Sequence, residues 1–432
     1  MRIGIVGLGY VGLTLAIAAA DCGLEVYGTE INANIKNCLS ENRAHFFEPG
    51  LDDLICRYNH KNFYCEDKFP VNKKFDAFII TVGTPLKAES KIPNFSAITA
   101  AIKSVSEVYD GSQLVILRST VSVGTTRNVV IPMLQEICGK SEVFVSMCPE
   151  RTVEGKAIEE LKNLPQVISG NNPTALNMAE KIFSQITDSI IKADSLEEAE
   201  LIKLYCNTYR DMNFSIGNAF CLASQTFGVN GVNAINRANK GYKRSGIALP
   251  GFVAGPCLEK DAYILTNNMV DCISRDFILN ARQVNESLED EVVEWVKRRV
   301  GEPAENIFIT LSGMAFKGRP ATSDLRGSSS VNIARKLNRL GYKLKLHDFV
   351  AGVAEMASLD FGNSYSDLNI ACENSVALIV LNNHKNYSEI ETIGNLDKNA
   401  VILDTWNVCS KLHEKYSNVC TLGNINLGGV AK

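Results

Sequence analysis

Residues 2–12 read RIGIVGLGYVG, a short apolar run that enters three glycines spaced G-x-G-x-x-G. An Ala-rich stretch at 13–22 follows, and a second apolar run at 24–30 ends in Glu30. Strand, glycine loop, helix and second strand, in this order, predict a dinucleotide-binding βαβ unit at the start of a parallel sheet. A glycine turn with a purely structural purpose is the alternative.

Each glycine of this loop has its own physical reason. Gly7 permits the tight turn after the strand, Gly9 lets a pyrophosphate approach the backbone, and Gly12 lets the helix pack on the strand. The helix N-terminus then attracts the phosphates. Glu30 can accept hydrogen bonds from both hydroxyls of the adenosine ribose and would repel a 2′-phosphate, which favours NAD over NADP.

The composition describes a globular protein of several domains. A length of 432 residues predicts two or three of them, with 46% apolar and 21% charged residues. A net charge of −4 without a basic run argues against a nucleic-acid or membrane partner, and the apolar runs are too short for a signal peptide or a membrane span. Thirteen cysteines without a C-x-x-C and five scattered histidines predict a reducing cytoplasm and no metal.

Further buried strands are predicted at 76–82, 114–117 and 143–147. Each enters a loop at the carboxyl end of the predicted sheet, where ligands bind in this architecture, although any one loop by itself reads equally well as an ordinary turn. The last loop contains Glu150 and Glu154, four residues apart beside a proline and a glycine. These two carboxylates either hold a water or lie on a solvated surface.

From Ser195 to about residue 228 the pattern becomes a long helix, with a capping box at its start and apolar residues on most faces. We expect this helix to be largely buried. Lys203, Asn207 and Arg210 form one polar line along it, at i, i+4 and i+7. A buried lysine is costly unless it is paired or used; a solvated helix edge is the alternative.

Residues 250–261 read PGFVAGPCLEKD, in which Cys257 follows a loop stiffened by prolines and opened by glycines. If Cys257 opens a helix, the free N–H groups there favour its thiolate, and Asp261 lies one turn along on the same face. A buried core cysteine is the alternative for this residue taken alone.

After residue 300 the pattern of strand, glycine loop, helix and strand ending in an acid recurs at 306–313, 328–340 and 342–348, with later strands at 375–381 and 400–404. The predicted fold class is therefore α/β, with two Rossmann-like parallel-sheet domains, 1–193 and 304–432, joined by a central all-helical domain, 194–303. We therefore expect the second of these domains to bind a second nucleotide-like ligand besides NAD.

Taken together, these segments resemble the UDP-glucose/GDP-mannose dehydrogenase family of nucleotide-sugar 6-dehydrogenases, and the likeness covers almost the whole chain. The family oxidises a sugar hydroxymethyl to a carboxylate in two hydride transfers, with a cysteine as nucleophile. The segments that carry the likeness are 7–13, 118–126, 149–155, 200–210, 250–261 and 315–328.

The resemblance implies three sets of site residues. The catalytic set is Cys257, Lys203, Asn207, Asp261, Thr120 and Glu154. The cofactor-binding set is Gly7, Gly9, Tyr10, Val11, Gly12, Glu30, Thr84, Pro85, Thr120 and Arg326. The substrate-binding set is Glu150, Arg151, Glu154, Lys203, Asn207, Arg210, Arg244, Gly251, Phe252 and Lys317.

The chemistry gives these residues distinct roles. Lys203 and Asn207, one turn apart, can stabilise a developing oxyanion. Asp261 can hold Lys203 or the hydrolytic water, and Glu154 with Thr120 can orient that water. In the family, a cation matched by Arg244 reaches the sugar across a dimer; the long apolar helix also predicts a homodimer or higher homo-oligomer.

Three segments, 148–151, 207–211 and 228–230, look closer to the UDP-N-acetylhexosamine branch of the family. The expected substrate is therefore UDP-N-acetylmannosamine or UDP-N-acetylglucosamine, for surface polysaccharide precursors; UDP-glucose or GDP-mannose is the alternative. The chain departs from the family pattern at Arg118, at residues 254–256, at Gly327 and at Trp406.

Two other functions are consistent with parts of the sequence. A two-electron dehydrogenase of the 6-phosphogluconate or 3-hydroxyacid type also joins a Rossmann domain to a helical domain, but it needs neither the cysteine nor the residues after 300. A non-catalytic NAD-dependent sensor is compatible with the altered loop before Cys257, but not with retention of Lys203, Asn207 and Asp261.

Overall fold

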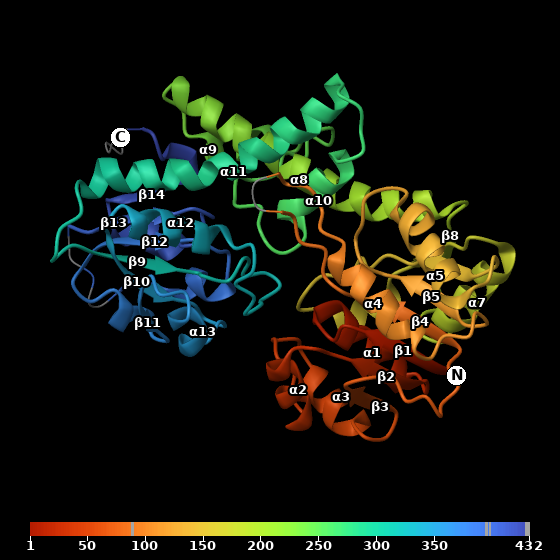
Figure 1. Ribbon diagram of the computed structural model, residues 1–432. Coiled ribbons are helices and arrows are strands. Elements are labelled where there is room, and N and C mark those ends of the chain that lie inside the picture. The colour runs from red at the N-terminus through yellow and green to blue at the C-terminus, as the bar shows by residue number, and fades with distance from the viewer. Residues whose placement is uncertain (88–89, 394–395, 397–398, 428–432) are drawn as a thin grey trace. The chain divides into compact units, whose positions relative to one another are not determined.

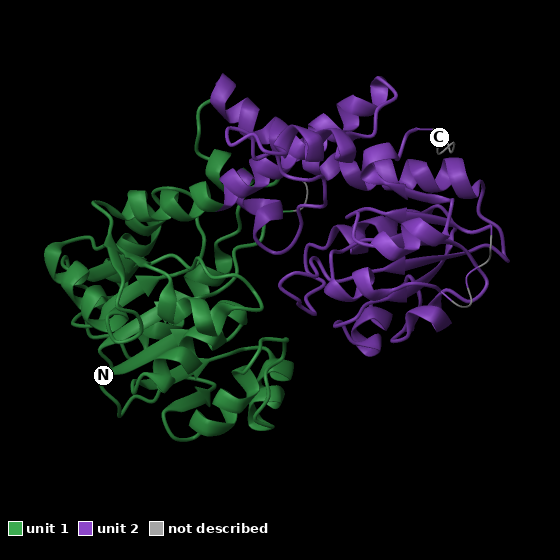
Figure 2. Ribbon diagram, turned by 180° about the vertical axis from the view of Figure 1, so that it is seen from behind, with its two compact units in different colours: residues 1–206, 263–270 green, residues 207–262, 271–432 purple. Residues whose placement is uncertain are grey.

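A computed structural model describes residues 1–87, 90–393, 396 and 399–427. The chain divides into two compact units, each described by itself below (Figure 2). Unit 1 comprises residues 1–206 and 263–270, and unit 2 comprises residues 207–262 and 271–432. The domain boundaries at 193 and 303 stay a prediction.

Unit 1 contains a six-stranded parallel sheet in the order β3-β2-β1-β4-β5-β6. The order reverses next to β1, because Ile3 pairs with Val26 on one side and Ala77 on the other. This reversal is the topological switch point at which doubly wound sheets bind ligands. The strands are β1 (Arg2–Val6), β2 (Glu25–Thr29), β3 (Phe63–Glu66), β4 (Ala77–Ile80), β5 (Leu114–Leu117) and β6 (Phe144–Met147).

Both faces of this sheet are covered, which explains why its strands are apolar throughout. In β4, Ala77 and Ile79 join the core on the side of α1 and α7, whereas Phe78 and Ile80 join the core on the side of α4. The helices are α1 (Tyr10–Asp21), α2 (Ala33–Ser40), α3 (Leu51–Tyr58), α4 (Ser96–Ser106), α5 (Ile131–Cys138), α6 (Ala157–Asn163) and α7 (Pro173–Phe183). A π-helical turn, η1 (Thr126–Val130), precedes α5, and β7 (Gln166–Ile168) pairs with β8 (Ile190–Lys192).

The predicted long helix is α8 (Leu196–Thr226). Its predicted cap is present in part: Ser195 Oγ accepts the N–H of Glu198 at 3.0 Å, but the Glu198 carboxylate accepts from the N–H of Asp194. The prediction of a largely buried helix is wrong for one side of α8. Tyr205 and Tyr209 are 57% and 68% exposed there, and Phe220 is 50% exposed.

Unit 2 contains a second sheet with the architecture of the first, in the last third of the chain, which is coloured blue in Figure 1. Its parallel sheet has the order β11-β10-β9-β12-β13-β14, which matches the first sheet strand for strand. The predicted pair of Rossmann-like domains is therefore confirmed. The strands are β9 (Phe308–Ser312), β10 (Lys343–His347), β11 (Gly362–Tyr365), β12 (Ser375–Val380), β13 (Val401–Asp404) and β14 (Val419–Thr421).

Helices again lie on both faces of this second sheet. In β12, Ala377 and Ile379 pack toward α11 and α12, whereas Leu378 and Val380 pack toward α15. The helices are α9 (Gly231–Asn239), α10 (Leu258–Thr266), α11 (Ile273–Val300), α12 (Ser329–Arg339), α13 (Val353–Ala357), α14 (Leu368–Ala371) and α15 (Ser410–Lys415). Among the described residues, no helix combines the length and apolarity that crossing a membrane requires.

Candidate active site

The glycine loop of unit 1 fits a dinucleotide. Gly7 adopts a positive φ of 88°, and a Cβ on Gly12 would lie 1.9 Å from the Gly7 carbonyl oxygen. At Gly9, in contrast, a Cβ would meet no atom within 4 Å. The first and third glycines therefore serve the turn and the helix packing, and the second leaves open space above the backbone. Tyr10 and Val11 begin α1, three residues earlier than predicted, so their N–H groups face that space.

Glu30 stands where the sequence predicts the ribose acceptor. One carboxylate oxygen accepts the N–H of Leu8 at 2.8 Å, and the other accepts the N–H groups of Ile31 and Asn32. The acid therefore lies against the glycine loop, where an adenosine ribose would reach it. The donors, the open space and the acid together fit NAD, which supplies a hydride acceptor when bound.

Two further predicted cofactor residues come from loops that follow β4 and β5. The Thr84 hydroxyl donates to the carbonyl of Thr120 at 2.6 Å and so joins these two loops. Thr84 is buried, Pro85 is exposed and Thr120 is half-buried. The structure thus brings Thr84 and Thr120 together at the carboxyl edge of the sheet, as the parallel strands predict.

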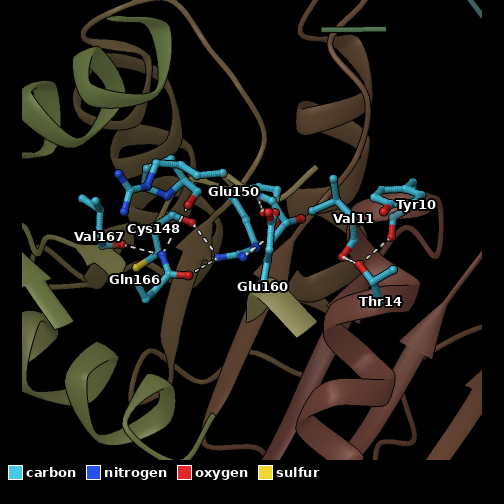
Figure 3. Close-up of polar contacts among 12 residues, drawn as sticks. Tyr10, Val11, Thr14, Cys148, Glu150, Glu160, Gln166 and Val167 are labelled. Carbon is cyan, nitrogen blue, oxygen red and sulfur yellow. Dashed lines mark hydrogen bonds and ion pairs between the residues drawn. The ribbon is translucent and has the colours of Figure 1, made fainter. Parts of the chain in front are cut away.

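The loop after β6 is fixed by a buried ion pair. Arg118 Nη2 lies 2.8 Å from Glu150 Oε2, and the two side chains are 1% and 9% exposed. Cys148, Glu150 and Gln166, which lie close together in Figure 3, all accept hydrogen bonds from Arg118. The departure at Arg118 therefore has a structural explanation, because its guanidinium neutralises a buried carboxylate.

Electrostatics keep that carboxylate ionised. Burial pushes the pKa of Glu150 up, but Arg118, the N–H of Thr152 and Lys203 outweigh burial and lower the pKa to about 2. Arg151, predicted to touch substrate, donates to the carbonyl of Pro165. Glu150 and Arg151 are thus engaged within unit 1, and their substrate contacts stay a prediction.

Sequence reasoning missed Glu48, a 6%-exposed acid that links two parts of the site. Its carboxylate accepts the Tyr10 hydroxyl at 2.6 Å and the N–H groups of Gly155 and Ala157, both at 2.7 Å. Burial, Glu48 and then Glu154 raise the pKa of Tyr10 far above its ordinary value. Glu48 therefore ties the cofactor loop to the loop that carries Glu154. The only sequence signal was an acid in front of Pro49 and Gly50.

Lys203, on α8, is 6% exposed. In the described part of unit 1 no hydrogen bond or ion pair holds its ammonium, although its charge helps to lower the pKa of Glu150. One turn earlier on the same helix, Glu200 accepts the N–H groups of Gly124 and Thr126 at 2.6 and 2.8 Å. Glu200 thus fastens α8 to the loop after β5, and Lys203 is a buried cation available for a ligand.

In unit 2, Cys257 is exposed and immediately precedes α10. The N–H groups of Lys260 and Asp261 donate to its carbonyl, at 3.1 and 3.0 Å. Cys257 therefore stands at the start of a helix, which meets the condition for a favoured thiolate, and the alternative of a buried core cysteine is wrong. The helix N-terminus favours a thiolate at this position.

A set of polar groups, two of them buried, gathers around Asp261 on the helix that follows Cys257. Asp261 is fully buried, and it accepts a hydrogen bond from the Asn207 amide at 2.6 Å and pairs with Lys260 at 2.9 Å. Sequence reasoning expected Lys203 or a water as the partner of Asp261 and missed Lys260. Burial pushes the pKa of Lys260 down, but Asp261 and Cys257 outweigh it and the pKa is raised. The same attraction favours the Cys257 thiolate.

The segment 250–257, here called the thiol loop, is supported by aromatic side chains. A Cβ on Gly251 would meet the Trp406 indole at 2.6 Å, and a Cβ on Gly255 would meet the Phe316 ring at 2.5 Å. Gly255 has a φ of 96°, and its N–H donates to the carbonyl of Gly327 at 2.7 Å. Both glycines are therefore required by close packing.

The remaining predicted residues lie on the surface of unit 2 or next to the thiol loop. Phe252 is buried, Arg210 is exposed, and Arg244 lies over the Tyr242 ring at 5.0 Å. Lys317 lies over the Phe316 ring at 5.2 Å, and Arg326 pairs with Asp324 at 2.6 Å. Their ligand contacts stay predictions. Among the described residues, no group of His, Cys, Asp and Glu has the arrangement of a metal site.

A dinucleotide cradle on one parallel sheet, a second sheet of the same topology and an exposed cysteine at a helix start define a nicotinamide-dependent dehydrogenase with a second nucleotide-binding domain. Family models agree with that class. The UDP-glucose/GDP-mannose dehydrogenase family matches with its NAD binding domain at residues 1–187, its central domain at 197–287 and its UDP binding domain at 310–411. The chain belongs to this family and is an NAD-dependent nucleotide-sugar dehydrogenase.

Known proteins similar to this chain include several UDP-N-acetyl-D-mannosamine dehydrogenases. The chain is 31% identical over 422 residues to UDP-N-acetyl-D-mannosamine dehydrogenase of Pyrococcus horikoshii, covering 94% of this chain and 96% of the relative. It is 29% identical over 420 residues to UDP-N-acetyl-D-mannosamine dehydrogenase of Methanocaldococcus jannaschii, covering 95% and 93%. A solved structure of UDP-D-ManNAc dehydrogenase from P. horikoshii has a TM-score of 0.86 and 29% identity, covering 99% and 100%.

Proposed function

We propose that the protein oxidises the C6 hydroxymethyl of UDP-N-acetylmannosamine to a carboxylate in two steps, with Cys257 as covalent nucleophile. The observation that carries the proposal is the exposed thiol at the start of α10, next to the half-buried Lys260 and the buried Asp261 and Asn207. A thiol used only for packing would be buried and would need no such charged surroundings.

The reaction balances as follows. Loss of a hydride and a proton converts the alcohol to an aldehyde; the Cys257 thiolate then forms a C–S bond to the aldehyde carbon, and the oxygen takes a proton. Loss of a second hydride and a proton from this thiohemiacetal leaves a thioester. Water attacks the thioester carbonyl, the C–S bond breaks and the thiolate returns. One alcohol and one water thus give one acid, two hydrides and two protons.

Lys203 and Asn207, four residues apart in α8, supply the oxyanion donors. The Asn207 amide has two N–H donors, and Asp261 takes one of them, which leaves the other for the substrate oxygen. Asp261 holds this amide and Lys260 in place. Glu154, on the loop that Glu48 fastens, orients the hydrolytic water together with the Thr120 hydroxyl.

The sugar is inferred from the relatives. UDP-N-acetyl-D-mannosamine dehydrogenases are 31% and 29% identical to the chain over nearly its full length. UDP-N-acetylglucosamine is the second candidate, and UDP-glucose and GDP-mannose are the remaining members of the test panel. A uronic acid made from such a sugar is a precursor for surface polysaccharide.

We further infer a homodimer in the cytoplasm. The exposed apolar side of α8, with Tyr205, Tyr209, Ile216 and Phe220, is a large surface for one chain to leave in water. Thirteen cysteines, none of them in a disulfide among the described residues, suit a reducing compartment.

The direct test is NADH production by the purified protein across these four nucleotide sugars. Two NADH per sugar, with UDP-N-acetylmannosamine turned over fastest, is the expected result. One NADH per sugar with accumulating aldehyde in the wild-type protein would contradict the four-electron reaction. Cys257→Ser should abolish the second oxidation, whereas Cys56→Ser, at another exposed thiol, should turn over like wild type.

A further inference from the structure

One side chain of α11 holds the backbone on both sides of Cys257. Arg282, 2% exposed, donates from Nη2 to the carbonyl of Val253 at 3.1 Å and from Nη1 to the carbonyl of Leu258 at 3.3 Å. These two carbonyls lie four residues before and one residue after Cys257. The guanidinium therefore spans the segment that carries the nucleophile.

A buried acid holds the guanidinium in turn. Arg282 Nη1 lies 2.6 Å from Asp211 Oδ1, and both side chains are at most 2% exposed. Asn285 donates to the same carboxylate oxygen and to the carbonyl of Asp211, both at 2.8 Å. The acid fixes the direction of the arginine and neutralises its charge in the interior.

The network then continues to the start of the thiol loop. Asn218 donates to Asn285 Oδ1 at 2.8 Å and exchanges two hydrogen bonds with the backbone of Gly251, at 2.9 and 3.1 Å. Gly251, Val253 and Leu258 are thus held by one connected set of buried side chains on α8 and α11. Apart from Asp211 Oδ2 and Arg282 Nε, which make no hydrogen bond to the described residues, the polar atoms of this set satisfy one another. Such buried networks rigidify the segment they hold.

Stability alone is a weak reason for this arrangement. Replacing a buried ion pair by apolar residues of similar volume is often neutral or stabilising, so the pair points to a geometric purpose. Arginine has five N–H donors in a rigid planar fork, which suits two carbonyls and a carboxylate at once. A lysine ammonium in the same place would reach fewer of these acceptors in a fixed direction.

We propose that Arg282, oriented by Asp211, is a positioning residue that sets where the Cys257 thiol stands for its attack on the aldehyde. The inference rests on the proposed function. The proposal predicts different effects on the two oxidations, because the first needs no thiol and the second begins with C–S bond formation. A misplacement of about 1 Å in a reacting group lowers a rate on the order of 100-fold.

The test compares Arg282→Gln with Arg298→Gln, which removes an exposed arginine from the same helix. Arg282→Gln should keep the first NADH release within about threefold of wild type, slow the second by at least roughly tenfold, and release aldehyde that semicarbazide traps. Arg298→Gln should release two NADH per sugar and no aldehyde. Arg282→Lys should recover part of the second step, since one ammonium still reaches one carbonyl.

A second readout does not depend on turnover. Alkylation of Cys257 by iodoacetamide, measured by peptide mass spectrometry relative to Cys56 in the same molecules, should shift to higher pH in Arg282→Gln. The shift is expected because a loosened loop takes the thiol away from the helix N-terminus and Lys260. If the wild-type protein releases one NADH with every sugar, the proposed four-electron function is wrong. The pH profile of Cys257 alkylation still decides in that case whether Arg282 positions the thiol.

Three results would overturn the proposal. The first is an Arg282→Gln protein with two NADH per sugar and the wild-type alkylation profile. The second is an equal loss of both oxidations together with a lower melting temperature, which indicates a structural role only. If Arg282→Gln does not fold, Asp211→Asn replaces it in the test, because asparagine has nearly the same shape as aspartate. The third result against the proposal is a folded Asp211→Asn protein that releases no trapped aldehyde.

Discussion

The buried pair of Arg118 and Glu150 allows a prediction with a magnitude and a sign. Arg118→Met keeps an unbranched side chain, although a shorter and uncharged one, and leaves a buried carboxylate without its cation. Breaking such a pair on one side costs about 3–5 kcal/mol. The exposed pair of Arg127 and Glu197, with side chains 48% and 30% exposed, provides a control: Arg127→Met should cost under about 1 kcal/mol.

The pH dependence should reverse in the variant. In wild type the pKa of Glu150 is lowered from 4.5 to about 2, so its ionisation contributes stability above pH 4.5 that is lost as the pH falls toward 2. At about 1.4 kcal/mol for each pKa unit, this contribution is about 3 kcal/mol. Removing Arg118 takes away the strongest opponent of burial, so we expect the pKa of Glu150 to rise above its ordinary value in the variant. Arg118→Met should therefore gain stability as the pH falls from 7 toward 5. In the wild-type protein, Glu150 contributes no gain in stability over this pH range.

Urea unfolding followed by far-UV circular dichroism at pH 7 and pH 5 measures both effects. The double variant Arg118→Met, Glu150→Gln should recover most of the loss, because no buried charge remains. An Arg118→Met protein within about 1 kcal/mol of wild type at pH 7 would refute the reasoning. So would a double variant no more stable than the single one, since the penalty would then lie elsewhere than in the uncompensated carboxylate.

Three further variants test the cofactor loop, the Glu154 loop and the thiol loop. Glu48→Gln should lower stability by about 2 kcal/mol, seen as a melting temperature roughly 4–8 °C lower, because an amide cannot accept all three hydrogen bonds. Gly12→Ala should abolish NAD binding in calorimetry, since its methyl would lie 1.9 Å from the Gly7 carbonyl oxygen, whereas Gly23→Ala, strained at a φ of 87° but with open space around it, should lose some stability and still bind NAD. Gly255→Ala should lose at least roughly tenfold in the second oxidation, because the methyl would meet Phe316 at 2.5 Å and displace the thiol; an unchanged rate would show that the loop tolerates the shift.

The fold was predictable because its signals are local. The glycine fingerprint at 7–12 and the acid at Glu30 lie within one βαβ unit, and a repeat of the same pattern after residue 300 gave the second sheet. The position of Cys257 at a helix start was local as well, since the prolines and glycines before it cannot continue a helix.

The residues that hold the site were not predictable, because their partners are distant in the chain. Glu48 lies 107 residues before Gly155, and Arg118 lies 32 residues before Glu150. A charged residue that is buried and paired looks the same in a sequence as one in solvent. Lys260 was missed for a different reason. Helical spacing pairs residues three or four positions apart, whereas the long Lys260 side chain reaches the carboxylate of the next residue, Asp261.

The error on α8 has the opposite origin. Its apolar residues were read as buried, but a long helix on one chain need not have a partner for every face, and Tyr205, Tyr209 and Phe220 remain in solvent. Apolarity in a sequence predicts that a face is covered in the functional assembly and not that a single chain covers it.

Three of the departures from the family pattern, at 254–256, Gly327 and Trp406, lie in or against the thiol loop, whereas Arg118 pairs with Glu150. Ala254 does not adopt a left-handed conformation, so its backbone tolerates a side chain. Gly255, at a φ of 96° against Phe316, does require glycine, and the chain retains it. At the departure Trp406, the indole N–H donates to the carbonyl of Leu381 at 3.0 Å and the ring lies on Gly251. Because its single N–H is already used, Trp406 serves as a packing support of the thiol loop and has no donor left for a phosphate.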